Sequence, residues 1–230
     1  MKSSMKITYS VISKTGRRSN NEDSVKVMDY SEESRWLGVV CDGMGGHAMG
    51  ELASETVCHA VCDYWQHSQN EDGAMLARKA CRSASVKLDE RSSGFNRIEM
   101  GTTLVMASID GNVATITHCG DSRCYLIRNG NVFYQTSDHI ETCFGWEVVA
   151  KCFFSYKPES AQPDIVQIEL KPGDRILLCS DGLYKSMPPE ILKARLMDDK
   201  SPEEILDVFD FLCEKNGDDN YTVILAIVDK

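Results

Sequence analysis

The sequence predicts an α+β fold, in which strands and helices form separate layers instead of alternating along the chain. Strand-like stretches come first, two long helical patterns follow, and a block of strands precedes a last helix and a last strand. Asp110-Gly111 and Asn129-Gly130 join strands within that block, and both dipeptides are strong signals of tight hairpins. Because hairpin-joined strands lie antiparallel, this order disfavours an alternating, doubly wound sheet.

The expected elements follow from local residue patterns. Strand-like composition predicts a first group of strands at residues 5–13, 24–30 and 35–42. Apolar residues at helical spacing then predict two helices, one carrying Ala53, Val57, Ala60, Val61, Tyr64 and Trp65 and the next carrying Leu76, Ala80, Ala84 and Leu88. Two hairpins follow, with strands expected at residues 102–109, 112–119, 123–128 and 131–136.

The C-terminal part is expected to complete the same domain. Residues 139–164 show no regular pattern and are predicted to be irregular. Ser201, Pro202 and Glu204 indicate a helix start, with Ser201 and Glu204 as a capping box. The remaining strands are expected at residues 164–170, 174–181 and 221–228. Residues 1–230 are therefore predicted to form one domain.

Composition limits the class of protein. The chain has 42% hydrophobic residues and a net charge of -10, so it can bury a core but is a poor partner for nucleic acid or an anionic membrane. We find neither an export signal at the N-terminus nor an apolar run of the roughly 18 residues that span a bilayer. Most of the ten cysteines have apolar neighbours, which predicts reduced thiols and a cytoplasmic location. Cys58 and Cys62 are interpreted as one helix face, not as zinc ligands.

Carboxylates recur at the ends of predicted strands, beside glycine or asparagine. The pairs are Glu22-Asp23, Asp42-Gly43, Gly120-Asp121, Asp181-Gly182 and Asp219-Asn220. Any single pair suits an ordinary surface turn, but five in one chain favour a site. Carboxylate and carbonyl oxygens are hard ligands that suit Mg²⁺ or Mn²⁺, and such a cluster is repulsive without a cation. Two divalent ions there would lower the pKa of a bridging water for in-line attack on phosphorus.

The glycines after Asp42 also permit a second interpretation, a dinucleotide site. Gly43, Gly45 and Ala48 match the G-x-G-x-x-G/A pattern, and Asp63 lies near the expected place of a ribose-binding acid. We reject this interpretation because Asp42 would put a carboxylate against the pyrophosphate, with no lysine or arginine beside it. Asp63 also falls within a helical pattern, and the hairpins give the wrong topology. A dinucleotide-dependent oxidoreductase is therefore less favoured than the two functions described below.

Taken together, these motifs resemble a known family. The metal-dependent serine/threonine protein phosphatases of type 2C, the PPM family, share a series of motifs that this chain resembles in the same order: GRRSNNED, VCDGMGGHAMGELAS, GTTL, HCGDSRCYLIRNG, TSDH, CSDGL and DDNYTVIL. The stretch DGMGGH resembles the bacterial branch of that family. The resemblance covers nearly the whole chain. It implies a four-layer α-β-β-α sandwich, with two mainly antiparallel central sheets flanked by helices and two Mn²⁺ or Mg²⁺ ions at one end.

The resemblance also implies roles for individual residues. Asp42 would bridge the two ions, and the Gly43 carbonyl would help to hold one of them. The other implied ligands are Asp181 and Asp219 for the first ion, Glu22 and Asp23 for the second ion and its waters, and Asp121 for a third, weaker ion. Arg18 would grip the substrate phosphate, since a guanidinium suits its oxygens and lies four residues before the acidic pair.

Other polar residues have less direct interpretations. Thr102 and Thr103 are expected to pack under the site, and Asn220 to fix the turn beside the last acidic residue. His47 keeps two open interpretations, as a proton donor near the leaving group or as a cap of the following helix. His118 and His139 are expected to be structural.

Two departures from the family's pattern affect these expectations. Met44 stands where the eukaryotic branch has a histidine that is proposed as a general acid. Water or His47 would then supply the proton, or the leaving group needs no acid. The stretch at about 139–164 is also shorter than the family's, which includes a mobile flap beside the active site, so we expect a shortened flap.

The expected activity is hydrolysis of phosphoserine and phosphothreonine in proteins by a metal-activated water, without a phosphoenzyme. The alternative is a catalytically weak regulatory module of the same fold that binds phosphoproteins or a kinase. Phosphorylated proteins are the expected partners, and the bacterial branch adds a serine/threonine protein kinase. No nucleic acid or membrane partner is expected, and the oligomeric state stays open.

Overall fold

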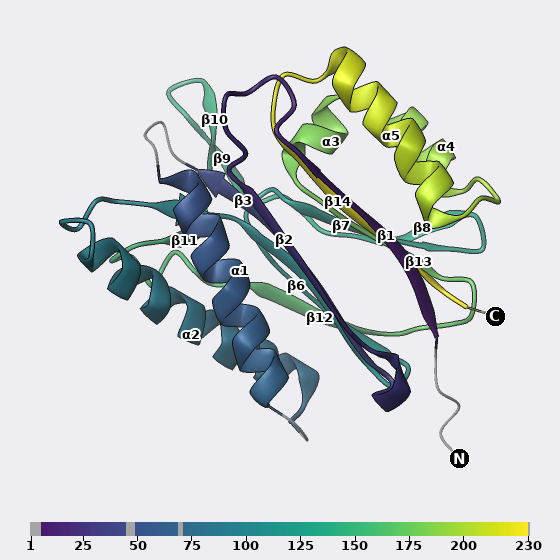
Figure 1. Ribbon diagram of the computed structural model, residues 1–230, viewed down its shortest axis with the longest axis horizontal. Coiled ribbons are helices and arrows are strands. Elements are labelled where there is room, and N and C mark those ends of the chain that lie inside the picture. Colours follow the sequence, from purple (N-terminus) through teal and green to yellow (C-terminus); the bar gives the residue numbers. More distant parts are fainter. Residues whose placement is uncertain (1–5, 45–48, 69–70, 230) are drawn as a thin grey trace.

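The computed structural model describes residues 6–44, 49–68 and 71–229. Its main strands form two sheets packed face to face, and helices cover the outer face of each sheet (Figure 1). The layers therefore follow the order helices, sheet, sheet, helices. The predicted α+β class and the four-layer sandwich are both confirmed.

One sheet has seven strands and carries two long helices on its outer face, α1 (Gly50–His67) and α2 (Gly73–Ser93). Its strands are β2 (Asp23–Tyr30), β3 (Arg35–Met44), β4 (Gly101–Thr102), β5 (Leu104–Asp110), β6 (Val113–Cys119), β11 (Phe153–Phe154) and β12 (Asp164–Glu169). Their order is β11-β4-β3-β5-β6-β12, with β2 also paired to β3. A short 3₁₀ helix, η1 (Ser31–Glu33), joins β2 to β3. All pairings are antiparallel, and two neighbouring pairs, β2–β3 and β5–β6, are consecutive in the chain.

The second sheet has five antiparallel strands in the order β1-β14-β13-β7-β8. These are β1 (Ile7–Lys14), β7 (Arg123–Arg128), β8 (Asn131–Gln135), β13 (Arg175–Cys179) and β14 (Tyr221–Val228). Three helices cover it, namely α3 (Asp181–Lys185), α4 (Pro189–Leu196) and α5 (Pro202–Asn216). The predicted capping box at the start of α5 is present. Among the described residues, none of the helices is long and apolar enough to cross a membrane.

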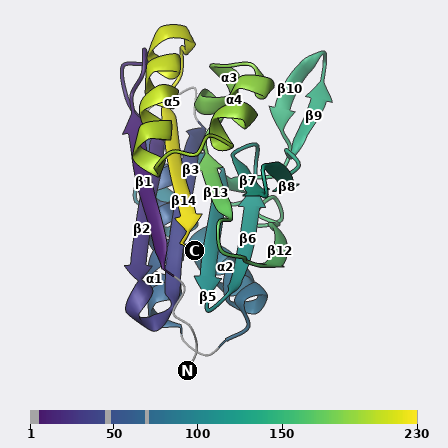
Figure 2. The ribbon, with the colours of Figure 1, turned by 90° about the vertical axis from the view of Figure 1, so that its right-hand side faces the viewer.

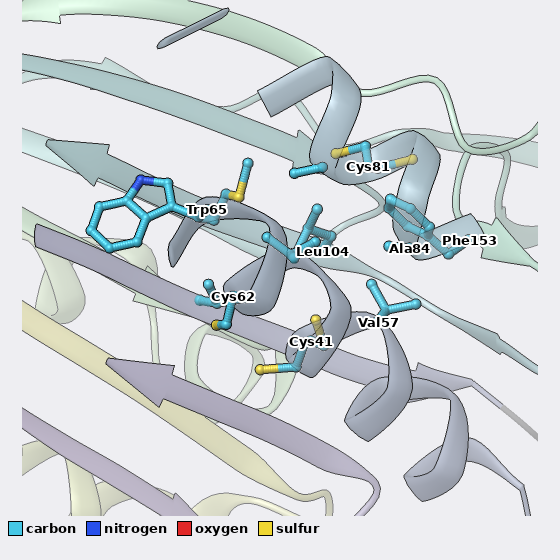
Figure 3. Close-up of a cluster of buried hydrophobic side chains, with 14 of the residues drawn as sticks. Cys41, Val57, Cys62, Trp65, Cys81, Ala84, Leu104 and Phe153 are labelled. Carbon is cyan, nitrogen blue, oxygen red and sulfur yellow. The ribbon is translucent and has the colours of Figure 1, made fainter. Parts of the chain in front are cut away.

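Three buried apolar clusters hold the four layers together. The cluster between the seven-stranded sheet and its helices includes Val57, Trp65, Leu104 and Phe153 (Figure 3). The cluster between the two sheets includes Trp36, Ile116, Leu178 and Ile224, and the third, under α3 to α5, includes Leu177, Leu192, Ile205 and Phe209. Burying each such side chain contributes roughly 1.5–3 kcal/mol. Each sheet is therefore apolar on both faces, and polar groups that must meet can do so at its ends.

The structure corrects the expectation that residues 139–164 are irregular. A two-stranded hairpin, β9 (Ile140–Cys143) and β10 (Trp146–Val149), lies in this segment, followed by β11. The prediction was wrong because the turn between these strands is Phe144-Gly145, whereas the strongest hairpin signals have asparagine or aspartate before the glycine. The helices α3 and α4 were also missed, since each spans too few residues to show a clear period.

Both predicted hairpins exist, but the four strands they join do not form one sheet. The pair β5–β6 belongs to the seven-stranded sheet, and the pair β7–β8 belongs to the five-stranded sheet. The chain therefore crosses from one sheet to the other at Gly120, Asp121 and Ser122. This crossing brings an acidic residue to the boundary between the sheets.

The hairpin β9–β10 extends beyond the sheets (Figure 2), and its turn is strained. Phe144 has φ 51° and is 99% exposed, while Gly145 has φ 86°. We expect Phe144→Asn to stabilise the hairpin by about 1 kcal/mol, since asparagine tolerates this conformation and little burial is lost. Amide hydrogen exchange at β9 and β10 should slow about fivefold in the variant. Unchanged or faster exchange would show that the Phe144 side chain stabilises the turn.

Candidate metal centre

The ends of several strands gather the predicted carboxylates at one end of the sandwich. Asp23 begins β2 and lies directly opposite Asp42, near the end of β3. Asp181 follows β13, Asp219 precedes β14, and Asp121 lies where the chain crosses between the sheets. The loop before β2 and the loop before β14 lie side by side at this end of the molecule (Figure 1). Five residues that are up to two hundred positions apart in sequence thereby meet in space.

The carboxylates are close enough to raise one another's pKa values. Removal from water raises the pKa of Asp42 well above its usual range, and the charges of Asp23, Asp181 and Asp121 raise it further. Burial also raises the pKa of Asp23 to about 7, although a hydrogen bond from the Ser180 hydroxyl, at 2.7 Å, opposes that rise. So many hard oxygen donors with unfavourable mutual repulsion fit a site for Mg²⁺ or Mn²⁺.

Three buried hydroxyl residues fix the main chain at Asp42. The Asp42 N–H donates to Thr103 Oγ1 at 3.0 Å, and the Thr102 hydroxyl donates to the Asp42 carbonyl at 2.9 Å. Thr103 Oγ1 also lies 2.7 Å from Ser122 Oγ, at the crossing between the sheets. Thr102 therefore lies beneath the acidic cluster, where the sequence analysis expected it. Thr103 lies there as well, as expected, and Ser122 supports it through a contact between their side chains that no sequence pattern reveals.

Two glycines allow the main chain at Gly43 to approach the start of α1. A Cβ on Gly43 would lie 2.2 Å from the Gly50 carbonyl oxygen. A Cβ on Gly50 would lie 2.2 Å from Glu22 Oε2 and 2.9 Å from the Gly43 carbonyl oxygen. A carboxylate oxygen of Glu22 and the Gly43 carbonyl oxygen thus both lie beside Gly50, where one cation could contact both. Burial raises the pKa of Glu22, and the charge of Glu51 raises it further.

The loop between β1 and β2 places Arg18 at the rim of the cluster. Arg18 is exposed, and its Nη2 lies 2.9 Å from Asp219 Oδ2. Asn220 holds the loop, since its Nδ2 donates to the Asn20 carbonyl at 2.7 Å and its Oδ1 accepts from the Glu22 N–H at 2.9 Å. Asn220 thus ties the arginine loop to β14, beside the turn that it was expected to fix.

A cation that the sequence analysis did not single out adjoins the cluster. Lys185 Nζ lies 2.5 Å from Asp181 Oδ2, one turn further along α3. Burial acts to lower the pKa of Lys185, but the hydrogen bond to Asp181 and the charges of Asp121 and Asp42 outweigh it and raise that pKa. The signal that could have found Lys185 is its i, i+4 spacing from Asp181.

Met44, which stands where the eukaryotic branch has its proposed general acid, is the last residue of β3, next to Gly43. His47 lies outside the described residues, so both of its interpretations remain predictions.

A separate group of His118, His139 and Asp164 also has the composition of a metal site, with its donor atoms within 4.8 Å of one another. His118 Nε2 lies 2.9 Å from the Ser137 carbonyl and must therefore donate a proton to it. His139 Nδ1 accepts from the Gly120 N–H at 3.2 Å, so its proton is on Nε2, 3.2 Å from Asp164 Oδ2. Since metal ligation at His139 Nε2 would displace that proton, a structural role agrees better with this geometry.

Comparison with known proteins places this geometry in a family. Residues 13–222 match the family described as protein phosphatase 2C. The serine/threonine protein phosphatase PstP of Mycobacterium tuberculosis is 31% identical over 92% of this chain, which spans 43% of that relative's length. The serine/threonine phosphatase stp of Listeria welshimeri is 28% identical, over 91% of this chain and 90% of its own length. The solved catalytic domain of PstP with two manganese ions has a TM-score of 0.83 and 29% identity, covering 98% of this chain and 100% of that one.

The chain belongs to the protein phosphatase 2C family. The predicted resemblance is therefore confirmed. The relatives that match are named serine/threonine phosphatases, and the chain spans less than half the length of PstP, the first of them. The alternative of a regulatory binding module is not favoured.

Proposed function

We propose that this chain hydrolyses phosphoserine and phosphothreonine in proteins with the help of two divalent cations, Mn²⁺ or Mg²⁺. The observation that carries the proposal is the carboxyl of Asp42, which lies opposite Asp23 and within the fields of Asp181 and Asp121. Such a cluster is unfavourable by itself, and divalent cations relieve its repulsion. The solved PstP domain, which carries two manganese ions, supports the choice of metal.

Within this proposal each oxygen donor has a role. Asp42 would hold both cations, together with Asp181 and Asp219 for one and with Glu22, Asp23 and the Gly43 carbonyl for the other. The closeness of Glu22 Oε2 and the Gly43 carbonyl to a single point beside Gly50 supports the second set. When bound, the cations supply an activated water and neutralise charge on the phosphate.

The chain's own residues position the substrate and the ligands. Arg18 orients the substrate phosphate, because its exposed guanidinium lies at the rim of the cluster and can donate two parallel hydrogen bonds. Thr102 holds the main chain of Asp42, and Asn220 holds the loop that carries Arg18 and Glu22. Preorganised groups of this kind avoid reorganisation when charge moves in the transition state.

Phosphorylated proteins are the proposed substrates, with a serine/threonine protein kinase as a proposed partner. We further propose a cytoplasmic location. All ten cysteines are free thiols, with Cys143 alone exposed, and this supports a reducing compartment. The segment at about 139–164 is proposed to be a shortened flap beside the site, since the hairpin β9–β10 begins at Ile140, next to His139, whose N–H donates to the Gly120 carbonyl at 3.0 Å.

The function is tested by hydrolysis of a phosphothreonine peptide by the purified protein. We expect turnover with Mn²⁺ or Mg²⁺ and none in excess EDTA, because the carboxylates alone provide neither a nucleophile nor a counter-charge. Released phosphate is the measured quantity. Absence of turnover with either metal, in a folded protein, would contradict the enzyme and favour the regulatory module.

Replacing Arg18 by alanine tests the proposed phosphate contact. We expect kcat/KM to fall about 10- to 150-fold, equivalent to the roughly 1.5–3 kcal/mol of hydrogen bonding to a charged group. The neighbouring Arg17→Ala is a matched control, since Arg17 is also exposed but donates to the Lys215 carbonyl at 3.0 Å. Equal losses in the two variants would show that Arg18 has no specific role.

A further inference from the structure

Within the part of the chain that the structure describes, the ammonium group of Lys185 lies beside the carboxylate of Asp181 and near that of Asp121. Lys185 Nζ lies 2.5 Å from Asp181 Oδ2, and the charges of Asp121 and Asp42 also act on it. The side chain of Asp181 is only 16% exposed, whereas that of Lys185 is 61% exposed, so the ammonium lies at the solvent side of the acidic cluster. This is the side from which a further cation would enter.

A second nearby cation, Arg123, is paired with a carboxylate outside the acidic cluster, that of Asp138. Arg123 donates to both carboxylate oxygens of Asp138, at 2.9 and 2.7 Å, and its guanidinium stacks on the Tyr184 ring at 3.5 Å. The Tyr184 hydroxyl in turn donates to the Asp121 carbonyl at 3.2 Å. Arg123 therefore helps to place Tyr184 against Asp121, while Lys185 is the side chain that offsets the negative charge of the Asp121 and Asp181 pair.

The Lys185 ammonium contributes to the charge balance of the proposed centre. The carboxylates of the centre are Glu22, Asp23, Asp42, Asp121, Asp181 and Asp219. Two divalent cations, the Arg18 guanidinium and the Lys185 ammonium carry as many positive charges as these six carboxylates carry negative ones. A third divalent cation beside Asp121 would leave an excess of positive charge and would lie close to the ammonium, which is unfavourable in a partly buried site.

We propose that the Lys185 ammonium serves as the cation of the Asp121–Asp181 pair, so that this chain binds two divalent cations and does not bind a third there. The inference rests on the proposed function, since it assumes the centre with two cations. It departs from the expectation that Asp121 holds a third, weaker ion. The carboxylate of Asp121 suits a cation. In this chain, however, the positive charge beside it comes from Lys185, which lies on the same short helix, α3, as Asp181.

Binding of Mn²⁺ to the full chain tests the inference independently of activity. Free Mn²⁺ is measured by electron paramagnetic resonance during titration up to millimolar concentrations. We expect two bound ions for the wild type and for Lys185→Arg, which keeps the charge. Lys185→Met and Lys185→Gln, which remove the charge from an exposed position, are expected to bind three.

A double variant locates the third ion. Lys185→Met combined with Asp121→Asn should return to two bound ions, because the new site then lacks its carboxylate. Three ions bound by the wild type, or only two by both Lys185→Met and Lys185→Gln, would overturn the inference and leave the proposed function standing. Fewer than two ions bound by the wild type would instead contradict the proposed function itself.

Discussion

Replacement of Asp42 by asparagine is expected to lower phosphopeptide hydrolysis by about a thousandfold or more, equivalent to roughly 4 kcal/mol of transition-state stabilisation. Asparagine keeps the size of the side chain but removes the charge that we propose bridges the two cations. It leaves in place the contacts of the Asp42 main chain with Thr102 and Thr103. The loss should therefore appear in kcat, measured with saturating Mn²⁺ and substrate, without a change in the fold.

The stability of the same variant separates a chemical from a structural cause. Because Asp42 is surrounded by other carboxylates, we expect the metal-free variant to unfold at a temperature equal to or a few degrees above that of the wild type. Asp110→Asn is the matched control, since Asp110 also precedes a glycine but ends β5, where it lies opposite Arg35 at the start of β3, far from Asp42. Wild-type activity of Asp42→Asn would exclude Asp42 as a bridging ligand.

The metal-free protein is expected to lose stability as the pH rises. The pKa of Asp23 is raised by burial from its ordinary 3.8 to about 7, and that of Asp42 is raised as well. Between the unfolded and folded pKa values the folded state binds more protons, so the free energy of unfolding falls with increasing pH. The contribution of protonated Asp23 to the free energy of unfolding is fully present below about pH 4 and is lost as the pH rises through about 7. Each pKa unit corresponds to about 1.4 kcal/mol, so the expected loss is on the order of 2–4 kcal/mol.

Thermal unfolding in EDTA at pH 5.5 and at pH 8 measures this effect. Added Mn²⁺ should stabilise the protein more at pH 8, because protons no longer compete for the carboxylates. At a concentration one hundred times Kd, each bound ion adds about 2.7 kcal/mol to the free energy of unfolding. The variant Asp23→Asn should lose less stability than the wild type between pH 5.5 and pH 8. A metal-free protein that is more stable at pH 8 would contradict the close packing of these carboxylates.

Much of the centre could be predicted because its ligands are local signals. A carboxylate beside glycine at the end of an apolar strand is visible without any structure, as at Asp42 and Asp181. The order of the motifs then predicted the family, and the comparisons confirm it. The residues that hold the ligands were less accessible. Ser122 and Gly50 act through a side-chain contact with Thr103 and a close approach of the main chain, and neither contact has a sequence signature.

The hairpin β9–β10 shows the limit of local patterns. Its strands are short and its turn uses Phe144 at positive φ, so neither composition nor turn chemistry indicates it. The pairs β5–β6 and β7–β8 were predicted from their turns, yet their assignment to different sheets depends on which core each pair covers. Pairing within a hairpin is decided over a few residues, whereas the choice of sheet is decided by burial over the whole domain.

The sequence by itself determined the longer strands and helices, the α+β class and the acidic groups, since these depend on apolar periodicity, turn residues and ligand chemistry within short stretches. Only the tertiary structure decided that Asp23 lies opposite Asp42, and that Asn220 joins the last turn to the loop bearing Arg18. It also decided that Lys185 contacts Asp181, because a flexible side chain reaches its partner only where burial and neighbouring charges favour that contact. These contacts depend on distances between residues far apart in the chain, which the packing of two sheets and their helices sets.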